Sequence, residues 1–165
     1  MATITNAKLE IGSNASTGTS NCVVTCRVTF TKYEQNEMKE GLKFALHCAL
    51  WGEDNGLGAL INPDDFIFSY ASKHYPDATP SSPEVATFTA TLGTNLLNED
   101  FGTDEVYGRL RLKHLYTGNV VTAKTNVIKR NFRSGQRRAN RVFSPLARPQ
   151  PMPCGTLPPA HHRGV

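Results

Sequence analysis

The sequence has no hydrophobic run long enough to cross a bilayer, since a spanning helix needs about 20 consecutive apolar residues. Its first 15 residues carry one lysine and one glutamate and have no apolar core, so they lack the features of a secretory signal peptide. These absences predict a protein without a transmembrane segment. We expect it to be cytoplasmic, or exported without a recognisable signal peptide.

Motifs of common enzymatic chemistry are also missing. There is no nucleophile elbow and no metalloprotease helix motif. The glycines of residues 52–58 neither carry a lysine nor lead into a helix, which excludes a phosphate-binding loop. His47 and His114 fall in expected strands, where packing or solvation accounts for them. We therefore predict no enzymatic activity and assign no catalytic residues.

Cysteine is scarce and badly spaced for zinc. Cys22, Cys26, Cys48 and Cys154 form no Cys-x-x-Cys pair. Without a signal peptide, reduced thiols that pack as small hydrophobic side chains are the favoured interpretation. A disulfide between Cys26 and Cys48 is the alternative.

Acidic residues are absent after Glu105, so charge divides the chain into two parts. Residues 1–132 hold 12 lysines and arginines against all 14 acids, a charge of −2; residues 133–165 hold six arginines and no acid, a charge of +6. The second segment is rich in proline and shows no alternation, so burial cannot offset its ordering entropy. We predict a sandwich domain over 1–132 and a basic, disordered tail or interaction arm over 133–165.

What the chain does contain is period-two alternation of apolar and polar residues, the pattern of half-buried strands. Residues 34–41 are interpreted as a polar turn. Seven strands without a helical period predict an all-β fold, a seven-stranded antiparallel immunoglobulin-like β-sandwich with a disordered C-terminal tail. The predicted strands are 7–11, 22–33, 42–51, 66–70, 85–92, 105–115 and the partner that follows Gly118-Asn119.

Gly118-Asn119 suits a two-residue hairpin turn. With these as the loop residues, Leu110 faces Val127, Leu112 faces Thr125 and Tyr116 faces Val121. That register puts apolar residues on one side of the hairpin. It puts a basic ribbon on the other: Arg109, Arg111, Lys113 and Lys124.

The segment that enters the sixth predicted strand, Asp104-Glu105-Val106-Tyr107, resembles the tyrosine corner of immunoglobulin-like domains. The aspartate usual four residues before the tyrosine is Thr103 here, and no cysteine follows two residues later. The resemblance covers one corner of the fold and identifies no family.

Two acidic loops would meet at one end of such a sandwich. Carboxylates in flexible loops are ligands that calcium uses, although no loop has the ligand spacing of a known calcium motif. The alternative is that these acids solvate the end of the sheets. The candidate calcium ligands are Glu53, Asp54, Asp64, Asp65, Glu99, Asp100 and Asp104.

The basic ribbon could meet a polyanion or lipid headgroups. We favour a solvated face that prevents aggregation, because no aromatic residue interleaves with the basic row as a stacking platform would need. Trp51, at a strand end, is a candidate interface anchor, a residue packed beneath the acidic loop, or one that fills the other side of a bent strand. In the tail, the candidates for contacts with nucleic acid, a neighbouring subunit or the acidic end are Arg133, Arg137, Arg138 and Arg141. The alternative is a tail without an evolved role.

Together these features predict a non-enzymatic β-sandwich module for binding or assembly, such as a self-associating structural subunit. A protein partner or self-association is the leading expectation. A calcium-dependent sandwich that binds a ligand or membrane through the acidic loops is the first alternative. Polyanion binding, to nucleic acid through the arginine-rich tail, is the second. No cofactor is expected apart from calcium in the first alternative.

Overall fold

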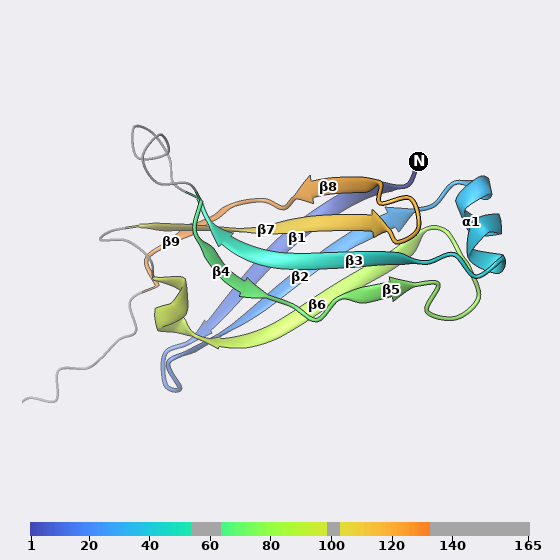
Figure 1. The fold of residues 1–165 in the computed structure, drawn as a ribbon. Helices are drawn as coiled ribbons and strands as arrows, with labels where there is room; N and C mark the ends of the chain where they lie inside the picture. Colours follow the sequence, from blue (N-terminus) through green and yellow to red (C-terminus); the bar gives the residue numbers. More distant parts are fainter. Residues whose placement is uncertain (54–63, 99–102, 133–165) are drawn as a thin grey trace, which may run out of the picture. The chain divides into compact units, whose positions relative to one another are not determined.

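The computed structural model of the 165-residue chain describes residues 1–53, 64–98 and 103–132, all within one compact unit, Met1–Gly135. These residues form antiparallel β-sheets with one short α-helix and one 3-10 turn (Figure 1). The prediction of an all-β fold is confirmed. The elements are β1 Thr3–Asn14, β2 Thr19–Thr29, α1 Lys32–Lys39, β3 Phe44–Gly52, β4 Phe66–Ser69, β5 Lys73–Tyr75, β6 Glu84–Gly93, η2 Thr94–Leu97, β7 Asp104–His114, β8 Val120–Lys124 and β9 Ile128–Arg130.

The strands belong to two sheets. The small sheet has the order β1-β2-β6. The large sheet has the order β4-β3-β7-β8, and β5 also pairs with β3 while β9 pairs with β7. The described residues thus hold nine strands rather than the predicted seven. The two additions, β5 and β9, have three residues each, which is too short for alternation to reveal them.

One buried core is shared by both sheets, as the alternation predicts. In the small sheet, Val24 and Val28 of β2 have no exposed surface, and in the large sheet neither have Leu46 and Leu50 of β3. Each such side chain stabilises the fold by about 1.5–3 kcal/mol through burial. Tyr70 connects the sheets, since its hydroxyl donates a hydrogen bond of 3.2 Å to the carbonyl of Cys22.

The helix α1 contradicts the prediction of a polar turn over residues 34–41. It begins with a capping box, in which the Thr31 hydroxyl accepts a hydrogen bond from the Glu34 amide and the Glu34 carboxylate accepts one from the Thr31 amide. This pairing satisfies backbone donors that a helix start leaves free. The Thr-x-x-Glu spacing was present in the sequence and marks a helix start there.

The predicted register of the β7–β8 hairpin is wrong by four residues. Leu110 pairs with Ala123 and Leu112 with Val121, because the loop is formed by residues 115–118 and is centred two residues earlier than Gly118-Asn119. Its last backbone pair joins the His114 amide to the Asn119 carbonyl at 2.9 Å. A shift by an even number of residues leaves every side chain on its predicted face, so the cations of the basic ribbon still point away from the core.

Candidate functional site

The outer face of the large sheet carries the basic ribbon next to residues of β3. We call this the basic face. Across β3 and β7, His47 pairs with Arg111, Ala49 with Arg109 and Trp51 with Tyr107. Arg109 also pairs with Lys124 of β8. The basic face is defined by His47, Trp51, Phe66, Tyr107, Arg109, Arg111, Lys113 and Lys124.

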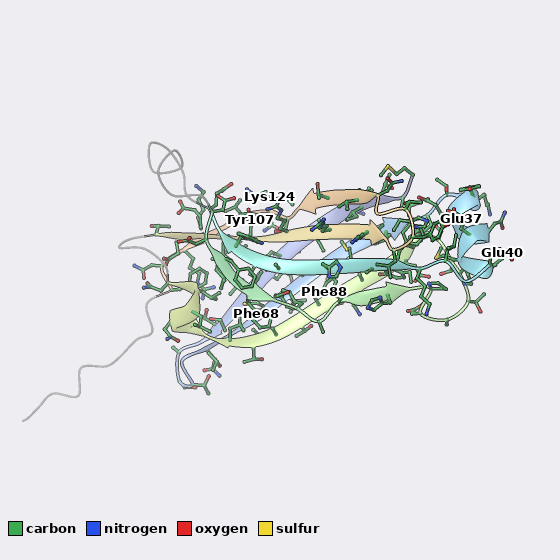
Figure 2. The ribbon with its side chains drawn as sticks, in the orientation of Figure 1. Glu37, Glu40, Phe68, Phe88, Tyr107 and Lys124 are labelled. Carbon is green, nitrogen blue, oxygen red and sulfur yellow. The ribbon has the colours of Figure 1, made fainter. Side chains whose placement is uncertain are left out.

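Aromatic rings lie directly beside the cations of this face. The Arg109 guanidinium is 5.6 Å from the centre of the Trp51 ring, and the Lys124 ammonium is 3.8 Å from the centre of the Tyr107 ring. Figure 2 shows Tyr107 and Lys124 together, where β7 begins and β8 ends. Trp51 in turn packs edge-on against Phe66, with ring centres 5.6 Å apart. The expectation that the basic ribbon lacks aromatic neighbours is therefore wrong: Tyr107 lies two residues before Arg109 on β7, and Trp51 lies opposite Tyr107 on β3.

Ion pairs neutralise only part of the basic face. Lys124 pairs with Glu53, beside the end of β3. Arg109, Arg111 and Lys113 form no ion pair with any residue in the described part of the chain. Both arginines are exposed and Lys113 is half-buried. Positive charge is thus concentrated along the middle of β7.

A hollow of about 280 Å³ lies over the centre of the basic face. Small side chains, Ala49 and Thr122, leave room between Arg109 and Arg111. On its rim, His47 exchanges a hydrogen bond of 2.6 Å with the Ser72 hydroxyl. A concave surface with two arginines that form no ion pair with a described residue can hold an anionic group by charge-assisted hydrogen bonds.

Trp51 borders this hollow, and its ring is half-buried. Its indole nitrogen Nε1 is buried and donates to no group among the residues that the structure describes. The alternative that Trp51 only fills the space under the acidic loop leaves this donor unexplained, because buried donors are nearly always paired.

Tyr107 does not form the tyrosine corner that the sequence suggested. Its hydroxyl donates a 2.6 Å hydrogen bond to the Asp64 carboxylate, 43 residues away, rather than to backbone shortly upstream. Burial, together with this hydrogen bond, raises the pKa of Tyr107. The hydroxyl therefore stays protonated and fixes the ring on which Lys124 lies.

The predicted calcium ligands meet in part. Backbone hydrogen bonds from the Gly52 amide to Asp65 and from the Glu53 amide to Glu105, 2.8 and 2.7 Å long, bring the end of β3 to the starts of β4 and β7. Asp54, Glu99 and Asp100 lie outside the described residues. Asp104 is buried, and its carboxylate accepts a 3.3 Å hydrogen bond from the Phe132 amide.

Within residues 1–53, 64–98 and 103–132, no group of three or more histidine, cysteine or acidic side chains is placed to hold a metal ion. Glu53 and Asp64 are engaged by Lys124 and Tyr107 instead. The calcium site stays a prediction that these contacts do not favour.

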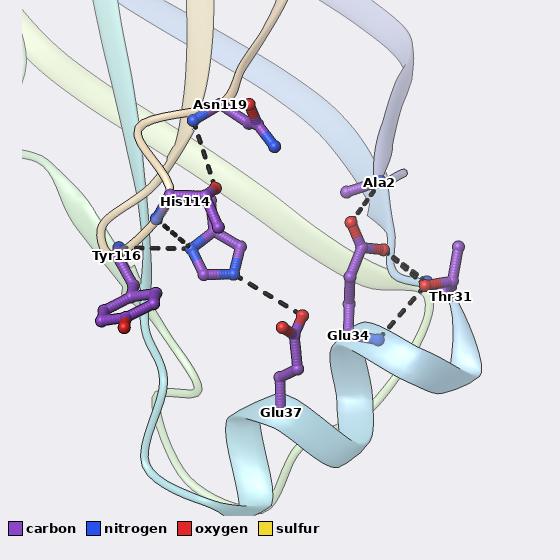
Figure 3. A network of polar contacts seen from close by, with 8 residues as sticks. Ala2, Thr31, Glu34, Glu37, His114, Tyr116 and Asn119 are labelled. Carbon is purple, nitrogen blue, oxygen red and sulfur yellow. Dashed lines mark hydrogen bonds and ion pairs between the residues drawn. The ribbon is translucent and has the colours of Figure 1, made fainter.

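A second polar cluster lies where α1 meets the β7–β8 loop (Figure 3). The His114 ring accepts at Nδ1 from the amides of Tyr116 and Thr117, at 3.2 and 3.3 Å, so its proton is on Nε2. That Nε2 lies 3.6 Å from Glu37 and makes no hydrogen bond to a described residue. The adjoining cavity measures about 30 Å³, which suits one water molecule and no larger ligand. We therefore assign this cluster a structural role, in which the His114 ring holds the β7–β8 loop beside α1.

The three described cysteines are free and buried, so the alternative of a Cys26–Cys48 disulfide is wrong. Burial raises the pKa of Cys22 and of Cys26 to about 11, and burial together with the nearby Cys26 raises the pKa of Cys48 to about 12. Protonated thiols are poor nucleophiles and poor metal ligands. These residues pack as small hydrophobic side chains, as predicted.

The tail candidates Arg133, Arg137, Arg138 and Arg141 lie outside the described residues, as does Cys154. None of the described helices is long and apolar enough to cross a membrane. No protein-family model matches the chain, and comparison with curated proteins and with solved structures finds no significant match.

Proposed function

We propose that the chain is a non-enzymatic binding module built on an immunoglobulin-like β-sandwich, and that its basic face binds an anionic polymer. The observation that carries the proposal is the pair Arg109 and Arg111, exposed beside a hollow and without an ion pair among the described residues. Alternate residues of a strand point the same way about 7 Å apart, so β7 presents a line of cations to a linear ligand.

Single-stranded nucleic acid is the polymer that would use both kinds of side chain on this face. Lysine and arginine attract the phosphates, while aromatic rings stack on unpaired bases. Phe66 is 57% exposed and packs edge-on against Trp51, so an aromatic residue at the end of the cation row is accessible to solvent. A sulfated glycan could use only the charges.

The test uses the only tryptophan of the chain, Trp51, as its reporter. Titration of the full chain with a single-stranded oligonucleotide should change the Trp51 fluorescence, and affinity should fall as salt rises. The logarithm of the binding constant should fall linearly with the logarithm of the salt concentration. Replacing Arg109 and Arg111 together by alanine should make this slope shallower by about 0.7 for each phosphate that the variant no longer binds. Arg27→Ala, an exposed arginine of the small sheet, is the matched control and should leave affinity and slope unchanged.

Two further measurements separate the alternatives. Truncation to residues 1–132 should preserve the fluorescence change, whereas loss of binding on truncation would assign it to the tail arginines. Heparin that binds as tightly as the oligonucleotide would remove the role given to the aromatic rings. Equal binding by the double alanine variant and the Arg27→Ala control would refute the basic face as the site.

A further inference from the structure

The outer edge of β6 is a long strand edge with little protection. β6 has ten residues and pairs with β2 along one edge, and no strand in the described part of the chain pairs with the other. Between Glu84 and the end of the strand it has no charged residue and no proline. Natural proteins usually blunt such edges with charges, prolines, bulges or very short strands, because a free edge recruits another strand.

The opposite edge of the small sheet, formed by β1, is covered by side chains that hydrogen-bond to its backbone. The Asn126 side chain covers β1, accepting from the Leu9 amide at 2.8 Å and donating to its carbonyl at 3.2 Å. Arg130 donates a further hydrogen bond of 3.1 Å to the Ile11 carbonyl. An irregularity between Thr5 and Lys8 interrupts the pairing of β1. In the large sheet, β4 and β5 have four and three residues, so they offer little edge.

The side chains of β6 suit pairing with a second β6. When two copies run antiparallel about Thr89, Thr87 lies opposite Thr91 of the other strand and Phe88 lies opposite Ala90. Threonines of the outer face then meet threonines, which are favourable cross-strand pairs. On the inner face the large Phe88 meets the small Ala90. Val85, whose side chain is 69% exposed, lies opposite Gly93.

A groove of about 260 Å³ runs beside this edge and gives an added strand room to dock. It lies between Thr87–Thr89 of β6 and Tyr70–Lys73 of the large sheet. The Lys73 ammonium lies 5.6 Å from the centre of the Phe88 ring, and Figure 2 shows Phe88 on β6 beneath the large sheet. The groove is lined by both polar and apolar side chains, so a strand laid along β6 would contact side chains there as well as pair its backbone.

We propose that β6 pairs antiparallel with β6 of a second copy, centred on Thr89, and joins the two small sheets into one six-stranded sheet. The contact is the same on both copies, so it closes after two and forms a dimer rather than a fibre. It uses the small sheet, whereas the basic face belongs to the large sheet. The proposals on dimerisation and on polymer binding can therefore fail independently.

Sedimentation velocity of the full chain over a concentration series tests the dimer. Thr89→Lys places two ammonium groups opposite each other at the centre of the contact, and its exposed position leaves the monomer fold intact. We expect a wild-type dimer and a dissociation constant at least tenfold higher for the variant, which corresponds to about 1.4 kcal/mol. Thr3→Lys makes the same charge change on the opposite edge of the same sheet and should dimerise as the wild type does.

Cross-linking tests the register directly in a Cys154→Ser background. Thr89→Cys should form a disulfide-linked dimer on mild oxidation, since its partner is the same residue of the other copy. Val85→Cys should not, because its counterpart would lie roughly 27 Å away along the strands. A wild-type monomer at every concentration, a dimer indifferent to Thr89→Lys, or equal cross-linking at positions 85 and 89 would each overturn the proposal.

Discussion

Glu34 is the residue whose replacement gives the sharpest test of how the helix end is held. Its carboxylate accepts three hydrogen bonds: from the Ala2 amide at 2.7 Å, from the Thr31 amide at 2.9 Å and from the Thr31 hydroxyl at 2.8 Å (Figure 3). Hydrogen bonds to a charged group contribute about 1.5–3 kcal/mol each. In Glu34→Gln one oxygen becomes an amide donor that faces another donor. We expect the free energy of unfolding to fall by about 2–3 kcal/mol at neutral pH.

The pH dependence follows from the same contacts. Burial by itself would raise the pKa of Glu34, but the hydrogen bonds from Thr31 and Ala2 and the charge of the N-terminus outweigh it, so its pKa lies below the ordinary value. Because the pKa of Glu34 is lower in the folded state than in the unfolded state, the stability that its ionised carboxylate contributes is fully present above the pKa of the unfolded state. That stability is lost as the pH falls through the pKa of the folded state. The difference between wild type and Glu34→Gln should therefore be largest near neutral pH and should shrink in acid.

Urea unfolding followed by far-UV circular dichroism, at neutral pH and again below the ordinary pKa of a glutamate, measures both quantities. Glu40→Gln is the matched control, because Glu40 lies exposed at the other end of α1 and its side chain has no hydrogen bond to another described residue. Its effect should stay within about 0.5 kcal/mol. A loss from Glu34→Gln no larger than that of the control, or a loss of equal size at both pH values, would refute this account.

Two further changes test the packing of the sheets. Asn126→Ala removes both hydrogen bonds to Leu9 and should lower the free energy of unfolding by about 2 kcal/mol. Amide hydrogens along β1 should also exchange faster; protection equal to that of the wild type would contradict the role of Asn126 in covering this edge. Gly108→Ala would bring a Cβ to 3.0 Å from Thr125 Cγ2 and 3.2 Å from Val24 Cγ2, both on buried residues. The free energy of unfolding should fall by about 1–3 kcal/mol in the same urea assay; an unchanged value would mean that the core relaxes there without strain.

The strands and their faces were readable from the sequence, because burial on one side of a sheet imposes an alternation that a single strand displays by itself. Residues such as Val24 and Leu46 lie in the core as that pattern predicts. The hairpin register was not readable, because Gly118-Asn119 indicates a turn without fixing the residue about which the loop is centred. The contacts of the site were hidden for a related reason. Trp51 and Arg109 lie 58 positions apart in the sequence, and only the pairing of β3 with β7 brings them together.

The acidic end and the basic ribbon, which the sequence suggested as two separate sites, are parts of one electrostatic arrangement. Glu53 follows β3 and pairs with Lys124, and Glu105 pairs with Lys129 at 3.3 Å. These pairs place acids against the cations nearest that end of the large sheet. Charge further along β7 is left uncompensated within the described residues, at Arg109, Arg111 and Lys113. Three cations of this face form no ion pair with a described residue, and one of them, Arg109, lies beside the Trp51 ring. Such cations suit a polyanion, because the phosphates that they neutralise release the counterions condensed on them.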